Sequence, residues 1–169
     1  FNIQKRIIRN YPIKSAANIL GYINEVNEIV AKNDDYYEQG ELIGKAGVEA
    51  QYEKELRGKK GKKYFRRDRL NKIMGTFKNG MYDSLSVNGK DITLTIDSNL
   101  QQYGESLMKG KRGGIIALEP SSGEILALIT APSYDPNMMV GRLRSPNSVK
   151  LLGDTINKPM YDRGLKGTY

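Results

Sequence analysis

Two uninterrupted apolar runs near the end of the chain, Ile115–Leu118 and Ile125–Ile129, constrain its fold more than any other feature. The segment between them contains Pro120, which fixes φ early in a turn, and Gly123, which can take a positive φ. Two short apolar runs on either side of such a turn predict a β-hairpin. Because neither run alternates with polar residues, we expect both faces of the hairpin to be covered in the native fold.

A hairpin covered on both faces needs one layer of structure above it and another below it. Residues 98–108 predict a helix that Asp97 caps, with an apolar stripe formed by Leu100, Tyr103 and Leu107. This helix can supply one of the two layers.

The chain beyond Pro132 is rich in Asn, Pro, Gly and Ser, and we expect loops there with short helices near 147–153 and 159–163. A segment of this kind is too short to supply the second layer. We therefore expect the hairpin to open a larger sheet domain that continues downstream of Tyr169.

The part of the chain before the hairpin is more polar and is punctuated by glycines. Residues 91–97 alternate strictly between apolar and polar side chains, which predicts a half-buried strand. Further forward, we expect a strand over residues 3–11 and a short helix that begins at a Ser15 cap and ends at Gly21. A strand end followed by a polar helix or loop is expected over residues 23–40.

A helix over residues 48–57 is also expected. Its apolar stripe would consist of Val48, Tyr52 and Leu56, which are spaced by four residues, and Gly58 would end it. Gly44 and Gly47 precede this helix with a spacing that fits no phosphate-binding motif, so we interpret them as a structural turn.

The net charge of +8 is concentrated in residues 54–72, which hold ten Lys and Arg against two Asp and Glu. We expect a β-ribbon here, with strands near 62–69 and 72–78 and a turn at Lys78-Asn79-Gly80. A basic run of this kind can bind nucleic acid or anionic lipid. We favour a solvated ribbon whose basic side chains point outward, because the segment contains no nucleic-acid-binding motif.

Cysteine and histidine are both absent, which excludes thiol chemistry, imidazole bases and the commonest zinc ligands. No apolar run approaches the roughly 20 residues that a membrane-spanning helix needs. Glu119 and Glu124 flank a surface turn, and we interpret them as solvated side chains and not as a catalytic pair. We predict no catalytic, cofactor-binding or metal-binding residue in this chain, and no cofactor.

Five blocks of sequence carry a family resemblance. They read RNYPIKSAANILGYI from Arg9, ELIGKAGVEAQYEKELRGKKG from Glu41, KDITLTIDSNLQ from Lys90, GGIIALEPSSGEILALITAPSYDPN from Gly113 and NKPMYDRGLKGTY from Asn157. In this order and spacing, the chain resembles a class B penicillin-binding protein of the elongation type, penicillin-binding protein 2. It departs from the usual family residues at Asn18, where His is common, and at Glu119, where Asp is common.

The resemblance implies an α+β fold with two parts. Residues 1–90 would form a mixed, non-catalytic pedestal (dimerisation) domain with short helices and β-ribbons. Residues 91–169 would form the truncated N-terminal part of an α/β transpeptidase domain, with its first strand, helix and hairpin. The acylating motif of the family, Ser-x-x-Lys, would begin a few residues after Tyr169, and we expect it and its partner motifs, Ser-x-Asn and Lys-Thr-Gly, to lie outside the chain.

The function implied by the resemblance is that of a non-catalytic portion of a penicillin-binding peptidoglycan D,D-transpeptidase, involved in cell-wall synthesis and cell shape. It would position the catalytic domain and contact the polymerase and scaffold proteins of the peptidoglycan-synthesis complex. It would lie in the periplasm or on the outer face of the bacterial inner membrane, with a membrane anchor upstream of Phe1. A β-lactam would bind only through the downstream domain, nucleic acid would not bind, and homo-oligomerisation is left open.

A different class of function is also open at this point. The chain could be a stand-alone binding module that uses the basic 54–72 ribbon on an anionic polymer. A penicillin-sensing receptor domain is a third alternative, which the pedestal-like front of the chain disfavours.

Overall fold

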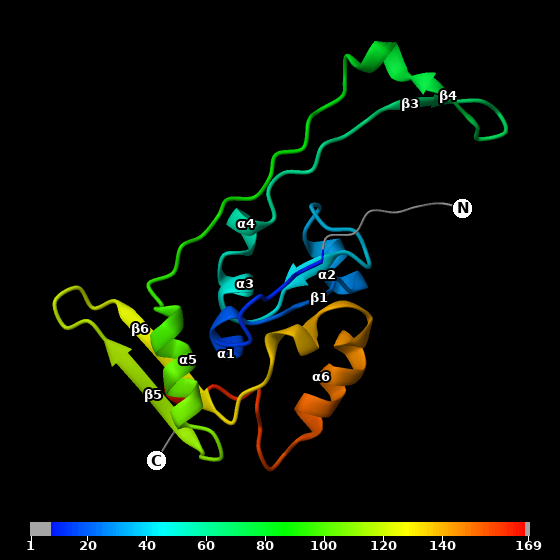
Figure 1. Cartoon of the computed structure of the whole chain (residues 1–169). Helices are drawn as coiled ribbons and strands as arrows, with labels where there is room; N and C mark the ends of the chain where they lie inside the picture. Colours follow the sequence, from blue (N-terminus) through cyan, green and yellow to red (C-terminus); the bar gives the residue numbers. More distant parts are fainter. Residues whose placement is uncertain (1–7, 168–169) are drawn as a thin grey trace.

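The structure is a computed structural model that describes residues 8–167, and it combines short helices with small antiparallel sheets in an α+β fold. The described residues form three two-stranded sheets, β1–β2, β3–β4 and β5–β6. Figure 1 shows that the front and the rear of the described chain build one body and that the middle of the chain extends away from it as a long arm. We call residues 59–87 the arm and the remaining described residues the body.

The front of the body contains α1 (Ala17–Leu20), β1 (Ile23–Glu25), α2 (Glu28–Asn33) and β2 (Leu42–Gly44) in chain order. The strands β1 and β2 pair antiparallel, and the mixed strand and polar helix expected over residues 23–40 are confirmed. Residues 8–11 of the strand expected at the start of the chain are irregular, and residues 3–7 lie outside the described residues.

The helix α1 ends at Gly21, as expected, with a φ of 78°. The prediction that Ser15 caps it is wrong. Ala16 occupies the cap position with a φ of 60°, and its N–H donates to the carboxylate of Glu105, which follows the arm in sequence, at 2.8 Å. Ser15 is buried, and its hydroxyl has no hydrogen-bond partner among the described residues.

The single helix expected over residues 48–57 is two short helices, α3 (Gly47–Gln51) and α4 (Glu53–Leu56). They are separated at Tyr52, whose backbone leaves the helical region and whose side chain is exposed. After this break the carboxylate of Glu53 faces β2, where it accepts hydrogen bonds from the N–H of Gly44 at 2.7 Å and from the hydroxyl of Tyr37. The apolar spacing could not show these contacts, which begin directly after the break.

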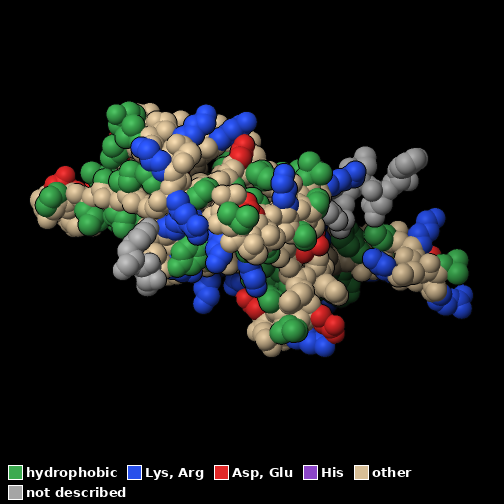
Figure 2. All heavy atoms as spheres, turned by 90° about the horizontal axis from the view of Figure 1, so that it is seen from below, with side chains coloured by type: hydrophobic (Ala, Val, Ile, Leu, Met, Phe, Trp, Pro, Cys, Tyr) green, Lys and Arg blue, Asp and Glu red, His purple; other side chains and the backbone are tan. Residues whose placement is uncertain are grey.

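The arm is a long antiparallel ribbon, as expected from the basic segment. Its outer end contains β3 (Phe65–Arg67), β4 (Ile73–Thr76) and the 3-10 turn η1 (Phe77–Gly80). Nearer the body, two isolated bridges join Lys59 to Val87 and Lys62 to Ser84. Figure 2 shows Lys and Arg side chains at the far end of the arm, and nearly all arm residues are exposed.

The hairpin is confirmed, with β5 (Gly113–Leu118) paired to β6 (Ile125–Ala131) and Gly123 at a φ of 77° in the turn. Before it, residues 91–97 alternate in burial as expected but are not assigned to a strand. They run past the unpaired edge of β6, where the Asp97 N–H donates to the Leu126 carbonyl at 2.9 Å. The half-buried pattern was therefore right, and the strand assignment was wrong.

Asp97 caps α5 (Ser98–Leu107) as expected, because its carboxylate accepts from the N–H groups of Asn99 and Leu100. The expected apolar stripe does not face the hairpin, because Leu100, Tyr103 and Leu107 are all exposed. The buried face of α5 instead carries Gln101 and Gly104. Gly104 allows close packing, since a Cβ there would lie 2.6 Å from the Ile129 Cδ1 atom.

The remainder of the chain forms η2 (Pro136–Met139), η3 (Gly141–Leu143), α6 (Arg144–Gly153) and α7 (Arg163–Lys166). The helix expected near 147–153 therefore starts earlier than predicted, and the one expected near 159–163 starts later. Within the described residues, no helix is long and apolar enough to cross a membrane.

The hairpin is covered unevenly. The strand β6 is buried from Ala127 to Ala131, whereas the β5 side chains of Ile115, Ile116 and Leu118 are exposed. Figure 2 shows the resulting apolar surface at the hairpin end of the molecule. The expectation that both faces are covered holds for β6 alone among the described residues.

The second face of β6 is packed by a segment that the sequence did not indicate. A Cβ on Gly164 in α7 would lie 2.8 Å from Leu128 Cδ1, and a Cβ on Gly114 would lie 2.9 Å from the Gly164 Cα. The end of the hairpin is therefore held between α5 on the Ile129 side and α7 on the Leu128 side. The prediction that the last residues supply no layer is wrong at this end of the hairpin.

Candidate functional site

The front and the rear of the body meet along a polar junction that joins residues far apart in sequence. The side chain of Asn137 accepts from the N–H of Tyr11 at 3.2 Å and donates to its carbonyl at 2.9 Å. The Asn18 amide donates to the Pro159 carbonyl at 3.3 Å. Because side chains here bind specific backbone groups, the junction fixes the orientation of the front relative to the hairpin.

A buried cation adds to the same junction. The guanidinium of Arg144, at the start of α6, donates to the Glu25 carboxylate of β1 at 2.8 Å. Arg144 is 7% exposed, so this pair is shielded from water on the arginine side. Charged pairs of this kind give directional contacts between two elements.

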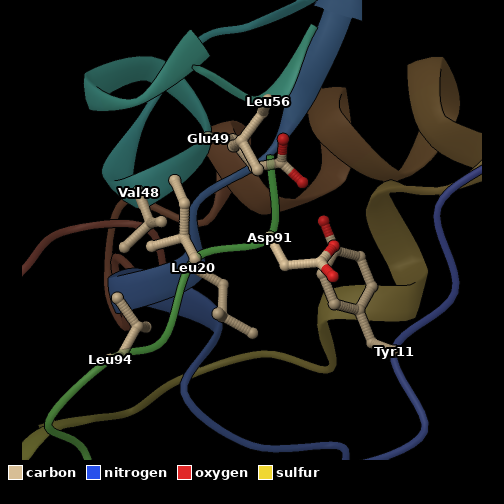
Figure 3. A pocket seen from close by; sticks show the side chains of 8 residues that line it. Tyr11, Leu20, Val48, Glu49, Leu56, Asp91 and Leu94 are labelled. Atoms are coloured by element: carbon tan, nitrogen blue, oxygen red, sulfur yellow. The ribbon is translucent and has the colours of Figure 1, made fainter. Parts of the chain in front are cut away.

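A cavity of about 430 Å³ lies beside the junction. Figure 3 shows Tyr11, Glu49 and Asp91 along one wall and the aliphatic side chains of Leu20 and Val48 along another. The remaining lining residues are also apolar: Leu56, Ile92 and Leu94. The cavity is thus formed by α1, α3, α4 and the extended segment that follows the arm.

The polar wall of this cavity is dominated by one ion pair. The Glu49 carboxylate accepts from Arg9 Nε at 2.7 Å and from Arg9 Nη2 at 2.9 Å. Glu49 is only 8% exposed, and its hydrogen bonds raise the pKa of Arg9 above its usual range. Since both carboxylate oxygens are engaged, Glu49 is an anchor for the segment around Arg9 and is not available as a base.

Tyr11, next to this pair, is held in its neutral form. Burial raises the pKa of its hydroxyl to about 12, and the nearby Glu49 carboxylate adds to the effect. A neutral tyrosine, a paired glutamate and an exposed Asp91 do not form an activated nucleophile with its base.

A second cavity of about 380 Å³ shares Leu20, Ile92 and Leu94 with the first. It is also lined by Ser15 and Gln101. No group of three or more metal-ligating side chains occurs anywhere in residues 8–167. Both cavities are lined by the extended segment after the arm, so this segment is loosely packed.

The sequence prediction placed the acylating motif and Ser-x-Asn outside the chain, but short matches to both patterns do occur in it. Ser106 is followed by Lys109 three places on, and Ser-x-Asn occurs at residues 86–88 and 145–147. Ser106 Oγ donates to the Tyr103 carbonyl at 2.6 Å, and α5 ends at Leu107, so Lys109 is not on the same helix.

These matches also lie on separate elements: the end of α5, the base of the arm and the start of α6. No hydrogen bond joins them among the residues that the structure describes. The prediction that this chain contains no catalytic residue therefore remains a prediction, now based on the placement of these groups and not on the absence of the patterns.

The base of the arm is fixed to the body by a cation–aromatic cluster. The Arg57 guanidinium lies 4.0 Å from the ring centroid of Tyr36 and 5.1 Å from that of Tyr37. It also donates to the Asp34 carboxylate at 3.0 Å. Lys60 lies 4.7 Å from the Tyr36 ring on the same side of the body. These contacts engage part of the basic segment, while the outer arm carries its cations free of the body.

Comparison with known proteins decides the family. The profile of the Penicillin-binding Protein dimerisation domain matches residues 1–94. A curated protein of Acinetobacter baumannii named "Peptidoglycan D,D-transpeptidase MrdA" is 34% identical over 99% of this chain. The chain belongs to the penicillin-binding protein 2 family. A protein of Salmonella typhimurium with the same name is 36% identical over 95% of the chain.

Solved structures of penicillin-binding protein 2 share the fold. One is a Helicobacter pylori complex between penicillin-binding protein 2 and MreC, with a TM-score of 0.76 and 30% identity over 92% of this chain and 29% of that one. Another is Pseudomonas aeruginosa penicillin-binding protein 2 with WCK 5153, with a TM-score of 0.71 and 36% identity over 95% of this chain and 31% of that one.

The extent of these matches bears on whether the chain is a portion of a transpeptidase or a stand-alone binding module. The chain spans about a quarter of the length of the curated relatives, 25% and 26% for the two named above. The family match includes the basic 54–72 ribbon, so a stand-alone module built on that ribbon is not favoured. Sequence reasoning found the family but missed Glu105, Asn137 and Arg144, whose roles depend on contacts more than 80 residues away in sequence.

Proposed function

We propose that this chain is the non-catalytic portion of a serine-type peptidoglycan D,D-transpeptidase. In this proposal residues 1–90 are the pedestal and residues 91–169 begin the transpeptidase domain. The observation that carries the proposal is the match to the MrdA relatives, which covers 95–99% of the chain at 34–36% identity. The residue where the family match ends, 94, is close to the proposed division.

The role of the chain is to hold the catalytic domain in a fixed orientation and to present the pedestal to partners. The polar junction supports this role, because it connects α1 and β1 rigidly to the hairpin region. The scaffold protein is the first partner we propose, since a neighbour 30% identical in sequence was solved in complex with MreC. A polymerase of the same complex, a homo-oligomer contact and an upstream membrane anchor follow from the same family role, at the periplasmic face of the inner membrane.

The reaction belongs to the downstream part of the protein. A serine oxygen bonds to the carbonyl carbon of the penultimate D-Ala, the C–N bond to the terminal D-Ala breaks, and D-Ala leaves with the serine proton. The amine of a neighbouring stem peptide then bonds to the same carbon, the ester C–O bond breaks, and the serine oxygen takes a proton back. A penicillin follows only the first step, with its ring C–N bond as the bond that breaks.

Labelling with a fluorescent penicillin tests the proposal. The full-length protein should become covalently labelled, and the chain of residues 1–169 should not. A Ser106→Ala variant of the full-length protein is the matched control, and it should label like the wild type. Labelling of residues 1–169 alone, or no labelling of the full-length protein, would contradict the proposal.

A further inference from the structure

The short helix α7 and the loop before it are held more firmly than their length suggests. Helices of four residues gain little from their own hydrogen bonds, so tertiary contacts must fix them. Three separate contacts do so here: a tether to β6, a glycine contact with the hairpin and a set of carbonyls around Arg163. The chain leaves α7 at Gly167, two residues before Tyr169.

The tether runs through Asp162. Its Oδ1 accepts from the N–H of Gly164 at 3.0 Å and from that of Leu165 at 3.2 Å, which caps α7. The same oxygen accepts from the Thr130 hydroxyl of β6 at 2.9 Å. Because one carboxylate oxygen serves both the helix cap and the strand, the start of α7 cannot shift along β6 without losing its cap.

The glycine contact sets the height of α7 above the hairpin. The Gly164 backbone approaches Gly114 of β5 so closely that a Cβ on either residue would overlap with neighbouring atoms, 2.9 Å from the Gly164 Cα or 2.8 Å from Leu128 Cδ1. The Gly164 backbone therefore lies directly on Gly114, with the Leu128 side chain packed beside it.

Arg163 holds the loop that leads into α7. Its guanidinium donates to the carbonyls of Lys158, at 3.1 Å, and of Asn157. Arg163 is 6% exposed, and its hydrogen-bond partners are backbone carbonyls without any carboxylate among the described residues. A buried guanidinium that several carbonyls satisfy orders a loop, because each bond fixes a different peptide group.

We infer that Thr130, Asp162 and Arg163 are positioning residues for the acylation step, because together they fix where the chain leaves α7 toward the reactive serine. The inference rests on the proposed function, in which that serine lies a few residues after Tyr169. We assign the three side chains no direct part in the chemistry. They act by setting the position of the serine, and a displacement of about 1 Å can slow a reaction by as much as 10²-fold.

The test uses the full-length protein and a fluorescent penicillin, with the saturating acylation rate constant measured apart from the concentration for half-saturation. The saturating rate constant is independent of the folded fraction, since only folded molecules react. Thr130→Val keeps the shape of the side chain and removes the hydroxyl, and Thr130→Ser restores it. Arg163→Lys keeps the charge but cannot bind several carbonyls in the same fork.

Thr95→Val is the matched control. The Thr95 hydroxyl also donates to this hairpin, to the Ile125 carbonyl at 2.7 Å, but at the end of β6 away from α7. Thr95→Val and Thr130→Ser should acylate within about threefold of the wild type, because neither removes the tether.

Thr130→Val and Arg163→Lys should lower the saturating rate constant about tenfold and leave the half-saturation concentration unchanged. The inference is overturned if both variants acylate at the wild-type rate, or if Thr95→Val is as slow as Thr130→Val. A wild-type protein that is not labelled at all would instead overturn the proposed function, and the inference with it.

Discussion

The arm and the body are made from the same chain by opposite kinds of contact. The arm is held by a backbone ladder between neighbouring strands, and its apolar side chains, such as Leu70 at 88% exposure, stay in water. The body is held by side chains that bind backbone groups across the junction, as Asn137 binds Tyr11. An isolated two-stranded ribbon is only marginally stable. We therefore expect the arm to open easily, and the body to unfold as one cooperative unit.

The largest expected effect is a difference between the arm and the body in their sensitivity to protease. Trypsin should cut first within residues 59–72 of the arm, where Lys and Arg are exposed and the ladder opens easily. The two resulting parts of the body should remain associated, because the junction contacts join them directly. The nicked chain should therefore give two bands on a denaturing gel and one species in gel filtration.

An early cut inside the hairpin or the junction would remove the contrast between arm and body. Separation of the two fragments after a cut in the arm would show that the junction is weak.

The next largest effect should be a loss of stability caused by a substitution in the cavity wall. Glu49→Gln leaves the Arg9 guanidinium without its carboxylate and should lower the free energy of unfolding by about 2 kcal/mol. The cost is below that for a fully buried pair because the Arg9 side chain is 32% exposed, against 11% for Glu49. Urea unfolding measures it.

Glu28→Gln is the matched control for this change. It breaks an ion pair with Lys32 in which both side chains are exposed, 69% and 71%, so the loss should stay below about 0.5 kcal/mol. Equal effects of the two substitutions would contradict the structural role of the cavity wall.

Gln101→Leu tests how the backbone of β6 is hydrogen-bonded at the edge that faces away from β5. The Gln101 amide accepts from the Leu128 N–H at 2.9 Å and donates to its carbonyl at 3.0 Å, as a neighbouring strand would. Without it, both buried backbone groups lose their partner, and the free energy of unfolding should fall by about 2 kcal/mol.

Hydrogen exchange at the Leu128 amide should accelerate in the same variant. Gln102→Leu, on the exposed side of α5, is the control and should change stability by less than about 0.5 kcal/mol. No change in Leu128 exchange would mean that another group completes this strand edge.

The last expected effect is a pH dependence that is absent at neutral pH and appears only in alkali. Burial raises the pKa of Tyr11 and of Tyr134 to about 12, whereas an unfolded tyrosine has a value of about 10. A raised pKa in the folded state means that the neutral form is favoured there. The resulting stability is complete below pH 10 and is lost as the pH rises from about 10 through 12.

Ultraviolet absorbance of tyrosinate, followed with pH, measures this directly. Tyr11→Phe should remove one late-titrating group and leave the stability at pH 7 nearly unchanged. Titration of Tyr11 near pH 10 in the folded chain would show that its burial is not maintained.

Features fixed by neighbours in sequence were predictable. The hairpin turn at Gly123, the Asp97 cap and the ends of helices at Gly21 and Gly58 all follow from local backbone preferences. The basic ribbon followed from composition and turn residues. The family resemblance was readable for the same reason, because its blocks are continuous in sequence.

Features fixed by distant contacts were not predictable. The stripe of Leu100, Tyr103 and Leu107 satisfies the helical period, yet α5 turns Gln101 and Gly104 toward β6. Periodicity shows which residues share a face of a helix but not which face is buried. In α5 the buried face is the one from which the Gln101 amide binds the backbone at the edge of β6. The same reasoning applies to Ser15, because Ala16 occupies the expected capping position and its N–H donates to the Glu105 carboxylate.

The sequence by itself determined the Gly123 turn, the Asp97 cap, the hairpin and the family, because each is encoded by residues that are close together in the sequence. Only the tertiary structure decided how the front is joined to the rear, which face of α5 is buried, and that α7 lies on the hairpin through Gly164. Those choices depend on the free energy of pairing backbone groups with side chains far away in the chain, and such pairings exist only once the chain has folded.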